Sequence, residues 1–129
     1  MSFVKIDLTK SKEPEIVPMG EYDLRVVKVM DTETKKKDPM TVLTIKIETT
    51  EVPNPAPVQH FITYPNGGQW DDMRALEIKR ILTLFDVRFD EAGFDSNDLL
   101  GQTGRCMVVQ EEGDDGVMRN RLKLPRLKE

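Results

Sequence analysis

The chain has 129 residues, of which 38% are hydrophobic and 33% charged, with a formal net charge of −4 at pH 7. This length suits one domain with one core, and no apolar run approaches the ~20 residues that a membrane span needs. One cysteine, Cys106, excludes an internal disulfide framework, and no secretory signal is visible, so we expect a single soluble, intracellular domain over residues 1–129.

Residues 1–18 are expected to form an extended N-terminal arm, because Val4, Ile6 and Leu8 alternate with polar residues. This arm either lies along the barrel or is partly mobile. A first main strand then begins at Gly20. Tyr22, Leu24 and Val26 share one face of it. The alternation changes phase at Val26-Val27, which predicts a bulge in a strand that serves a closing barrel.

A wholly polar segment, residues 31–39, separates this strand from the next and contains the triplet Lys35-Lys36-Lys37. We expect it to be a mobile loop. Strand pattern resumes at Val42. Leu43, Ile45 and Ile47 are predicted to face the core, with Lys46 on the opposite face together with Val42, Thr44 and Glu48.

The third strand is predicted over residues 58–64, after a proline-rich connector. Alternation places His60 on one face with Val58, Ile62 and Tyr64, and Phe61 on the other with Gln59 and Thr63. The opposite arrangement, with Phe61 in the core and His60 outside, stays open. Turn residues 65–68 end this strand.

The one convincing helix is predicted over residues 69–86. Its apolar residues follow helical spacing, so these should be buried: Ile78, Ile81, Leu82 and Phe85. Trp70, Met73 and Leu76 are expected to widen the buried band, and Asp71 and Asp72 to cap the first turn. A capped short helical turn ending in glycine is predicted over residues 95–101.

Two further strands follow, predicted over residues 105–111 and 117–124. The order is therefore strand, strand, strand, helix, strand, strand. This order predicts a mostly β OB-fold, a five-stranded barrel with one α-helix between strands 3 and 4. In such a barrel the loops between strands 1 and 2 and between strands 4 and 5 flank the binding face.

Positive charge gathers in two of these regions. Lys35, Lys36 and Lys37 lie in the first loop, where they either contact phosphates or form a solvated hairpin tip. Arg119, Arg121 and Lys123 alternate along one face of the fifth strand. This face either follows a phosphate backbone, forms a solvated edge, or pairs with acids from the helix side. Residues 116–129 carry five basic residues and one acidic residue.

Phe61 is a candidate base-stacking platform, because it would be an aromatic ring on the polar face of its strand. Tyr64 and Trp70 flank the turn at residues 65–68, and each could stack on a base or pack under the helix. For Trp70 we favour packing. The case for an enzyme is thin, since His60 is the only histidine and no phosphate loop or dinucleotide motif occurs. We expect no catalytic residue, metal or cofactor.

Several of these segments together resemble small phage and prophage single-stranded DNA-binding proteins. The resemblance rests on Pro18-Met19-Gly20-Glu21-Tyr22, the lysine-rich loop, Val42-Leu43-Thr44-Ile45-Lys46-Ile47, Asp98-Leu99-Leu100-Gly101 and the late Asn120. It implies an OB-fold protein that coats single strands in the host cytoplasm during phage replication, recombination or repair, without catalysis. It also places seven cations near the DNA: Lys35, Lys36, Lys37, Lys46, Arg119, Arg121 and Lys123.

The sequence therefore favours a module that binds single-stranded DNA with little sequence preference. Replication or recombination proteins are candidate further partners, and a homodimer is a candidate assembly. One alternative is an OB-type barrel for protein contacts, such as a phage structural or assembly component. Another is a small metal-dependent nuclease. Many proteins of the resembled family end in an acidic tail, whereas this sequence ends in basic residues, which puts tail-mediated recruitment in doubt.

Overall fold

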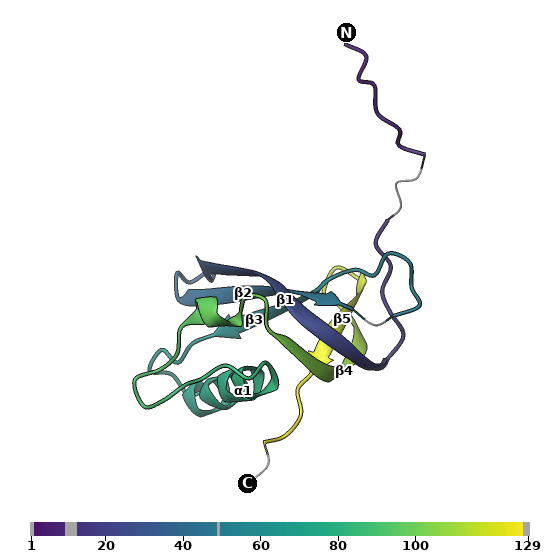
Figure 1. Ribbon diagram of the computed structural model, residues 1–129. Helices are drawn as coiled ribbons and strands as arrows, with labels where there is room; N and C mark the ends of the chain where they lie inside the picture. The colour runs from purple at the N-terminus through teal and green to yellow at the C-terminus, as the bar shows by residue number, and fades with distance from the viewer. Residues whose placement is uncertain (1, 10–12, 49, 128–129) are drawn as a thin grey trace.

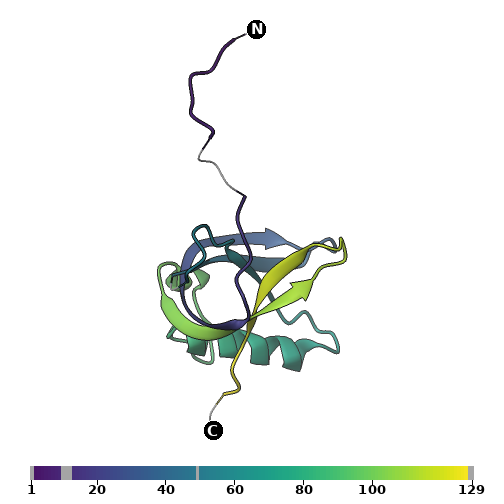
Figure 2. The same ribbon diagram turned by 90° about the vertical axis from the view of Figure 1, so that its right-hand side faces the viewer.

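The computed structural model describes residues 2–9, 13–48 and 50–127. In chain order its elements are β1 (Gly20–Glu33), β2 (Pro39–Ile47), β3 (Val58–Thr63), α1 (Asp71–Leu84), the short 3-10 helix η1 (Ser96–Leu99), β4 (Thr103–Glu112) and β5 (Met118–Lys123). The strands form one antiparallel sheet in the order β3-β2-β1-β4-β5 (Figure 1). Figure 2 shows this sheet curled almost into a ring, with α1 across one end.

The predicted fold class is confirmed: the chain is mostly β and forms an OB-like, partly open barrel with its helix between β3 and β4. Within the described residues no strand pairing joins β3 to β5, although these two edge strands come into contact. Both the first and the last residues of α1, β3, β4 and β5 lie within two positions of the predicted ones. Among the same residues, no helix has the length and apolar character that crossing a membrane requires.

The predicted phase change in β1 is a bulge, because the register against β2 shifts between Val26 and Lys28. Leu24 and Val26 face the core before the bulge, and Val29 packs against the core after it. The extra residue, Val27, is exposed. The bulge bends the strand, so its first half pairs with β4 while its later residues pair only with β2.

The link between β1 and β2 is shorter than expected. The polar segment at residues 31–39 was predicted to be loop, but β1 extends to Glu33 and β2 begins at Pro39. A side-chain hydrogen bond of 2.7 Å from the Thr41 hydroxyl to the Asp31 carboxylate joins the two strands in this region. Polar residues are compatible with a strand here because cross-strand hydrogen bonds satisfy them.

The core fills the barrel and the space under α1. Leu43, Ile45 and Ile47 are buried as predicted, and so are Ile81 and Leu82 of the helix. Phe85, just after the helix, is also buried, while Ile78 is only partly buried. The wider band predicted for the helix is wrong, since Trp70 and Met73 are each 52% exposed and Leu76 is exposed as well. The barrel end is covered by one side of the helix only.

The N-terminal arm lies along the barrel over residues 13–18, as expected. Glu15 forms a parallel bridge with Pro55, just before β3. Val17 is fully buried, and the Asn120 side chain of β5 accepts a hydrogen bond from its N–H at 2.8 Å and donates one to its C=O at 2.9 Å. The arm therefore connects the two sides of the open barrel, near the gap between β3 and β5.

Candidate nucleic-acid interface

An apolar row crosses the outer face of the sheet. Phe61 of β3 lies opposite Val42 of β2, and Val42 lies opposite Met30 of β1. Phe61 and Met30 are each 45% exposed, while Val42 is shielded between them. The alternation in β3 is as predicted, because Ile62 is buried and His60 is partly buried on the inner face. The arrangement with Phe61 in the core is therefore excluded.

A polar row lies next to the apolar one. Thr44 of β2 is opposite Gln59 of β3 on one side and Lys28 of β1 on the other. Lys46, two residues along β2, is exposed and pairs with Arg25. Sequence reasoning missed Lys28, because the bulge at Val27 decides which face the residues after it occupy. The phase change in the sequence was the signal that could have placed Lys28 outside.

A groove of about 640 Å³ separates this face from β5. Gln59 and Phe61 line one side, and Arg119 and Arg121 line the other. Pro14 and Ile16 of the arm also line it. The gap in the sheet therefore brings Phe61 of the third strand together with two of the predicted cations of the fifth.

The pKa of His60 in β3 is affected by Arg121 of β5, because the two strands lie close together. Burial, and to a smaller extent the positive charge of Arg121, lower the pKa of its imidazole from 6.5 to about 4. His60 is thus neutral at pH 7, behind the exposed face. An anion near Arg121 would reduce the repulsion and raise the pKa of His60.

The predicted alternation of β5 is confirmed, since Asn120 is buried while Arg119 and Arg121 are partly exposed. The three cations of this strand have different surroundings, however. Arg119 donates two hydrogen bonds to the Asp115 carboxylate, at 3.0 and 2.6 Å, and these bonds lower the pKa of Asp115 to about 2. Arg119 therefore pairs with an acid, but this acid comes from the β4–β5 loop and not from the helix side as the alternative had it. Lys123 is exposed beyond the residues that line the groove.

Some cations of the outer surface form ion pairs with carboxylates and others do not. Three arginines contact carboxylates: Arg25 with Glu48 at 2.7 Å, Arg105 with Asp23 at 3.1 Å and Arg119 with Asp115 at 2.6 Å. Among the described residues, no ion pair involves Lys28, Lys46, Arg121 or Lys123. Lys28, Lys46 and Arg121, which lie around Phe61, are thus among the cations available to an anionic ligand.

Lys35, Lys36 and Lys37 occupy a compact five-residue turn, residues 34–38, and all three side chains are exposed. Backbone hydrogen bonds close the turn, from the Thr34 N–H to the Asp38 C=O at 2.8 Å and from the Lys37 N–H to the Thr34 C=O at 2.9 Å. Lys37 has φ 65°, the left-handed conformation that ends such hairpin turns. The turn joins β1 and β2 at one end of these strands. The lysines therefore lie to one side of the apolar row of Phe61, Val42 and Met30, which runs across the strands.

Tyr64 and Trp70 are not brought to this face. Tyr64 lies toward the inner side, where its ring stacks on Phe94 at a centroid distance of 6.3 Å and its hydroxyl lies 2.7 Å from that of Thr41. Trp70 precedes α1 and is exposed, so the packing favoured for it is wrong. Asp71 was expected to cap the helix, but its carboxylate accepts hydrogen bonds from the N–H groups of Asn66 and Gly67 and so holds the preceding turn.

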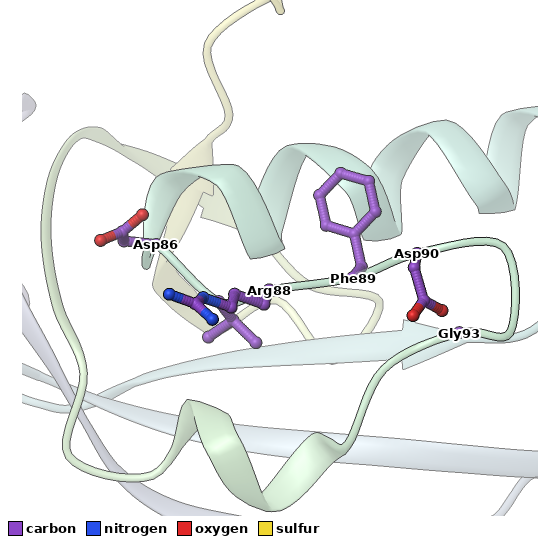
Figure 3. Close-up of a pocket in the computed structure, with 6 residues that line it drawn as sticks. Asp86, Arg88, Phe89, Asp90 and Gly93 are labelled. Atoms are coloured by element: carbon purple, nitrogen blue, oxygen red, sulfur yellow. The ribbon is translucent and has the colours of Figure 1, made fainter.

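A second hollow lies in the loop after α1, lined by Asp86, Arg88, Phe89 and Asp90 among others. Figure 3 shows that these side chains point in different directions and do not converge on a common point. Asp90 and Gly93 close the loop by mutual backbone hydrogen bonds of 3.1 Å. In the described part of the chain, no group of three His, Cys, Asp or Glu residues is arranged to hold a metal ion.

Comparison with known proteins adds no family assignment. No protein-family model matches the chain, and neither does any curated protein. The functional argument therefore depends on the geometry of the Phe61 face and the β3–β5 groove, together with the resemblance noted in the sequence.

Proposed function

We propose that the protein binds single-stranded DNA without strong sequence preference and coats it during phage replication, recombination or repair. The observation that carries the proposal is Phe61, an aromatic ring 45% exposed on the outer face of β3 beside the groove that Arg121 lines. Bases stack on such rings with about 1–3 kcal/mol each, whatever their identity. The proposal assigns no catalytic step to the chain.

The surroundings of Phe61 support a single strand as the ligand. Lys28 and Lys46 lie on the same outer face, and Arg121 lies across the groove. Side chains two residues apart on one strand face, such as Arg119 and Arg121 of β5, are about 6.6–6.8 Å apart, which is close to the repeat of an extended nucleotide chain. Flexible lysine side chains contact phosphates without reading bases, which fits weak sequence preference.

The wider setting of the proposal comes from the resemblance to phage single-stranded DNA-binding proteins. That resemblance supports action in the host cytoplasm beside replication or recombination proteins, with a homodimer as a candidate assembly. The lysine turn at residues 34–38 and Lys123 extend the proposed DNA path beyond the Phe61 row. Tyr64 is left out of this path because its ring already stacks on Phe94.

The test is fluorescence anisotropy with a labelled oligo-dT and with the same oligonucleotide as a duplex, at two salt concentrations. We expect Phe61→Ala to weaken single-strand binding by roughly 5- to 150-fold, which corresponds to the loss of about 1–3 kcal/mol of stacking. Phe89→Ala is the matched control, because Phe89 is 43% exposed but lies in the loop after α1.

Equal binding by Phe61→Ala and the parent protein would exclude this face. Absence of any salt-dependent binding to oligonucleotides would favour a barrel used for protein contacts. Cleavage of the oligonucleotide that appears only with Mg²⁺ or Mn²⁺ would instead identify a metal-dependent nuclease.

A further inference from the structure

Helix α1 carries an apolar stripe that the barrel does not cover. Trp70, Met73 and Leu76 follow one another at intervals of three residues, so they are neighbours on one side of the helix. All three are exposed, whereas Ile81 and Leu82 face the core. An uncovered row of three large apolar side chains on one helix is a feature of docking surfaces.

The stripe continues into a groove with a volume of about 1100 Å³. This groove lies between α1 and the segment that follows β5. Its apolar lining is aliphatic, from Leu76, Leu84, Pro125 and Leu127. Leu76 belongs to both the stripe and the groove, so the two form one surface, which we call the helix groove.

Among the described residues that line the groove beside Leu76, the charged ones are all basic: Lys79, Arg80 and Arg126. This is unusual in a protein with a net charge of −4. In addition, the Nε atom of Arg80 is buried and has no hydrogen-bond partner within the described part of the chain. A buried donor without a partner is unfavourable, and a carboxylate is the strongest acceptor that could satisfy it.

We propose that the helix groove binds a segment of another protein that carries carboxylates together with aliphatic or aromatic side chains. The apolar side chains would cover the stripe and the aliphatic lining, and the carboxylates would meet Lys79, Arg80 and Arg126. A nucleic acid fits less well, since the described residues around Lys79, Arg80 and Arg126 include no aromatic ring on which bases could stack, and Trp70, the one aromatic residue of the stripe, lies outside that part of the surface. The helix groove shares no described lining residue with the β3–β5 groove beside Phe61, so the proposal is independent of DNA binding.

The full chain contains its own reporter, because Trp70 is the only tryptophan and is 52% exposed at the start of the stripe. The probe is a short synthetic peptide that alternates leucine and aspartate. We expect its addition to shift Trp70 emission to shorter wavelength in a saturable way. Three control peptides replace aspartate by lysine, aspartate by asparagine, or leucine by serine, and each should bind at least about tenfold more weakly.

Two variants test the residues named. Arg80→Glu should weaken peptide binding by about tenfold or more, because a hydrogen-bonded charge pair becomes a repulsion. Lys79→Glu provides the same test at an exposed position in case Arg80→Glu does not fold, which thermal melting will show. Arg88→Glu is the matched control, since it makes the same charge change outside this groove.

Three results would overturn the proposal. The first is equal affinity for the aspartate and lysine peptides, or unchanged affinity in a folded Arg80→Glu or Lys79→Glu variant. The second is saturable quenching of Trp70 by oligo-dT that the same variants abolish, which would make the groove a nucleic-acid site. The third is self-association in sedimentation that these variants abolish, which would make a second copy the occupant.

Discussion

Asn120 provides a direct test of how the arm is held to the barrel. Its side chain is buried, with 4% exposure, and makes three hydrogen bonds: it accepts from the Val17 N–H and donates to the C=O groups of Val17 and Val109. Asn120→Ala removes all three. The Val17 C=O retains the Gln110 side-chain amide, at 3.0 Å, but the Val17 N–H is left without its partner.

The expected cost follows from this difference between the two Val17 groups. One buried N–H without a partner costs about 1–3 kcal/mol, and the remaining bonds contribute about 0.5–1.5 kcal/mol each. We therefore expect Asn120→Ala to lower the free energy of unfolding by roughly 2–6 kcal/mol in urea titrations. Amide exchange at Val17 should accelerate, because the arm is released. Gln110→Ala is the control and should cost less than about 1 kcal/mol, since Asn120 still satisfies the same carbonyl.

Asn120→Asp separates the two roles of the amide. The carboxylate can still accept from the Val17 N–H, but its second oxygen faces the carbonyls of Val17 and Val109 where a donor stood. Protonation restores a donor, so the destabilisation relative to the parent should diminish as the pH falls. A loss below about 0.5 kcal/mol for Asn120→Ala, with unchanged exchange at Val17, would refute the conclusion that Asn120 holds the arm.

Three further predictions concern the proposed DNA face. Arg121→Glu should weaken single-strand binding in anisotropy while changing stability by no more than about 0.5 kcal/mol, and normal affinity would move the DNA path away from β5. Changing Lys35, Lys36 and Lys37 together to alanine should lower the salt slope of binding by about 0.7 per lost phosphate contact, similarly for different sequences, and an unchanged slope would remove this turn from the interface. His60 has a folded-state pKa of about 4 against 6.5 when unfolded, so the unfolded chain takes up its proton first and stability falls as the pH drops from 6.5 towards 4. The loss attributable to His60 should be roughly 2–4 kcal/mol in chemical denaturation, and His60→Gln should remove it; parallel pH profiles for both proteins would contradict this.

The strand order and core could be predicted because they depend on local alternation. Leu43, Ile45 and Ile47 face inward because a period of two leaves no other placement once one face is buried. The bulge could also be predicted, because the phase change at Val26-Val27 is visible in the sequence. The same change of phase was also the signal for an outward-facing Lys28, a consequence that sequence reasoning missed.

The errors arose where the outcome depends on distant segments or on turn geometry. Helical spacing placed Trp70, Met73 and Leu76 beside the buried residues of the helix. The side of α1 that is covered, however, depends on how the barrel packs against it. Arg119 was expected to lie in a free cationic row. Its pairing with Asp115 depends on the loop at residues 113–117 turning the carboxylate back onto β5, which alternation does not show.

The attachment of the arm to β5 also has a consequence for the order of folding. The hydrogen bonds between Val17 and Asn120 join residues 103 positions apart, almost the two ends of the described chain. During synthesis the arm leaves the ribosome well before its anchor on β5 does. Contacts of such sequence separation form late, because the entropy of closing the intervening chain must be overcome first. The groove beside Phe61, lined by Pro14 and Ile16 of the arm, is therefore complete only once the whole barrel has folded.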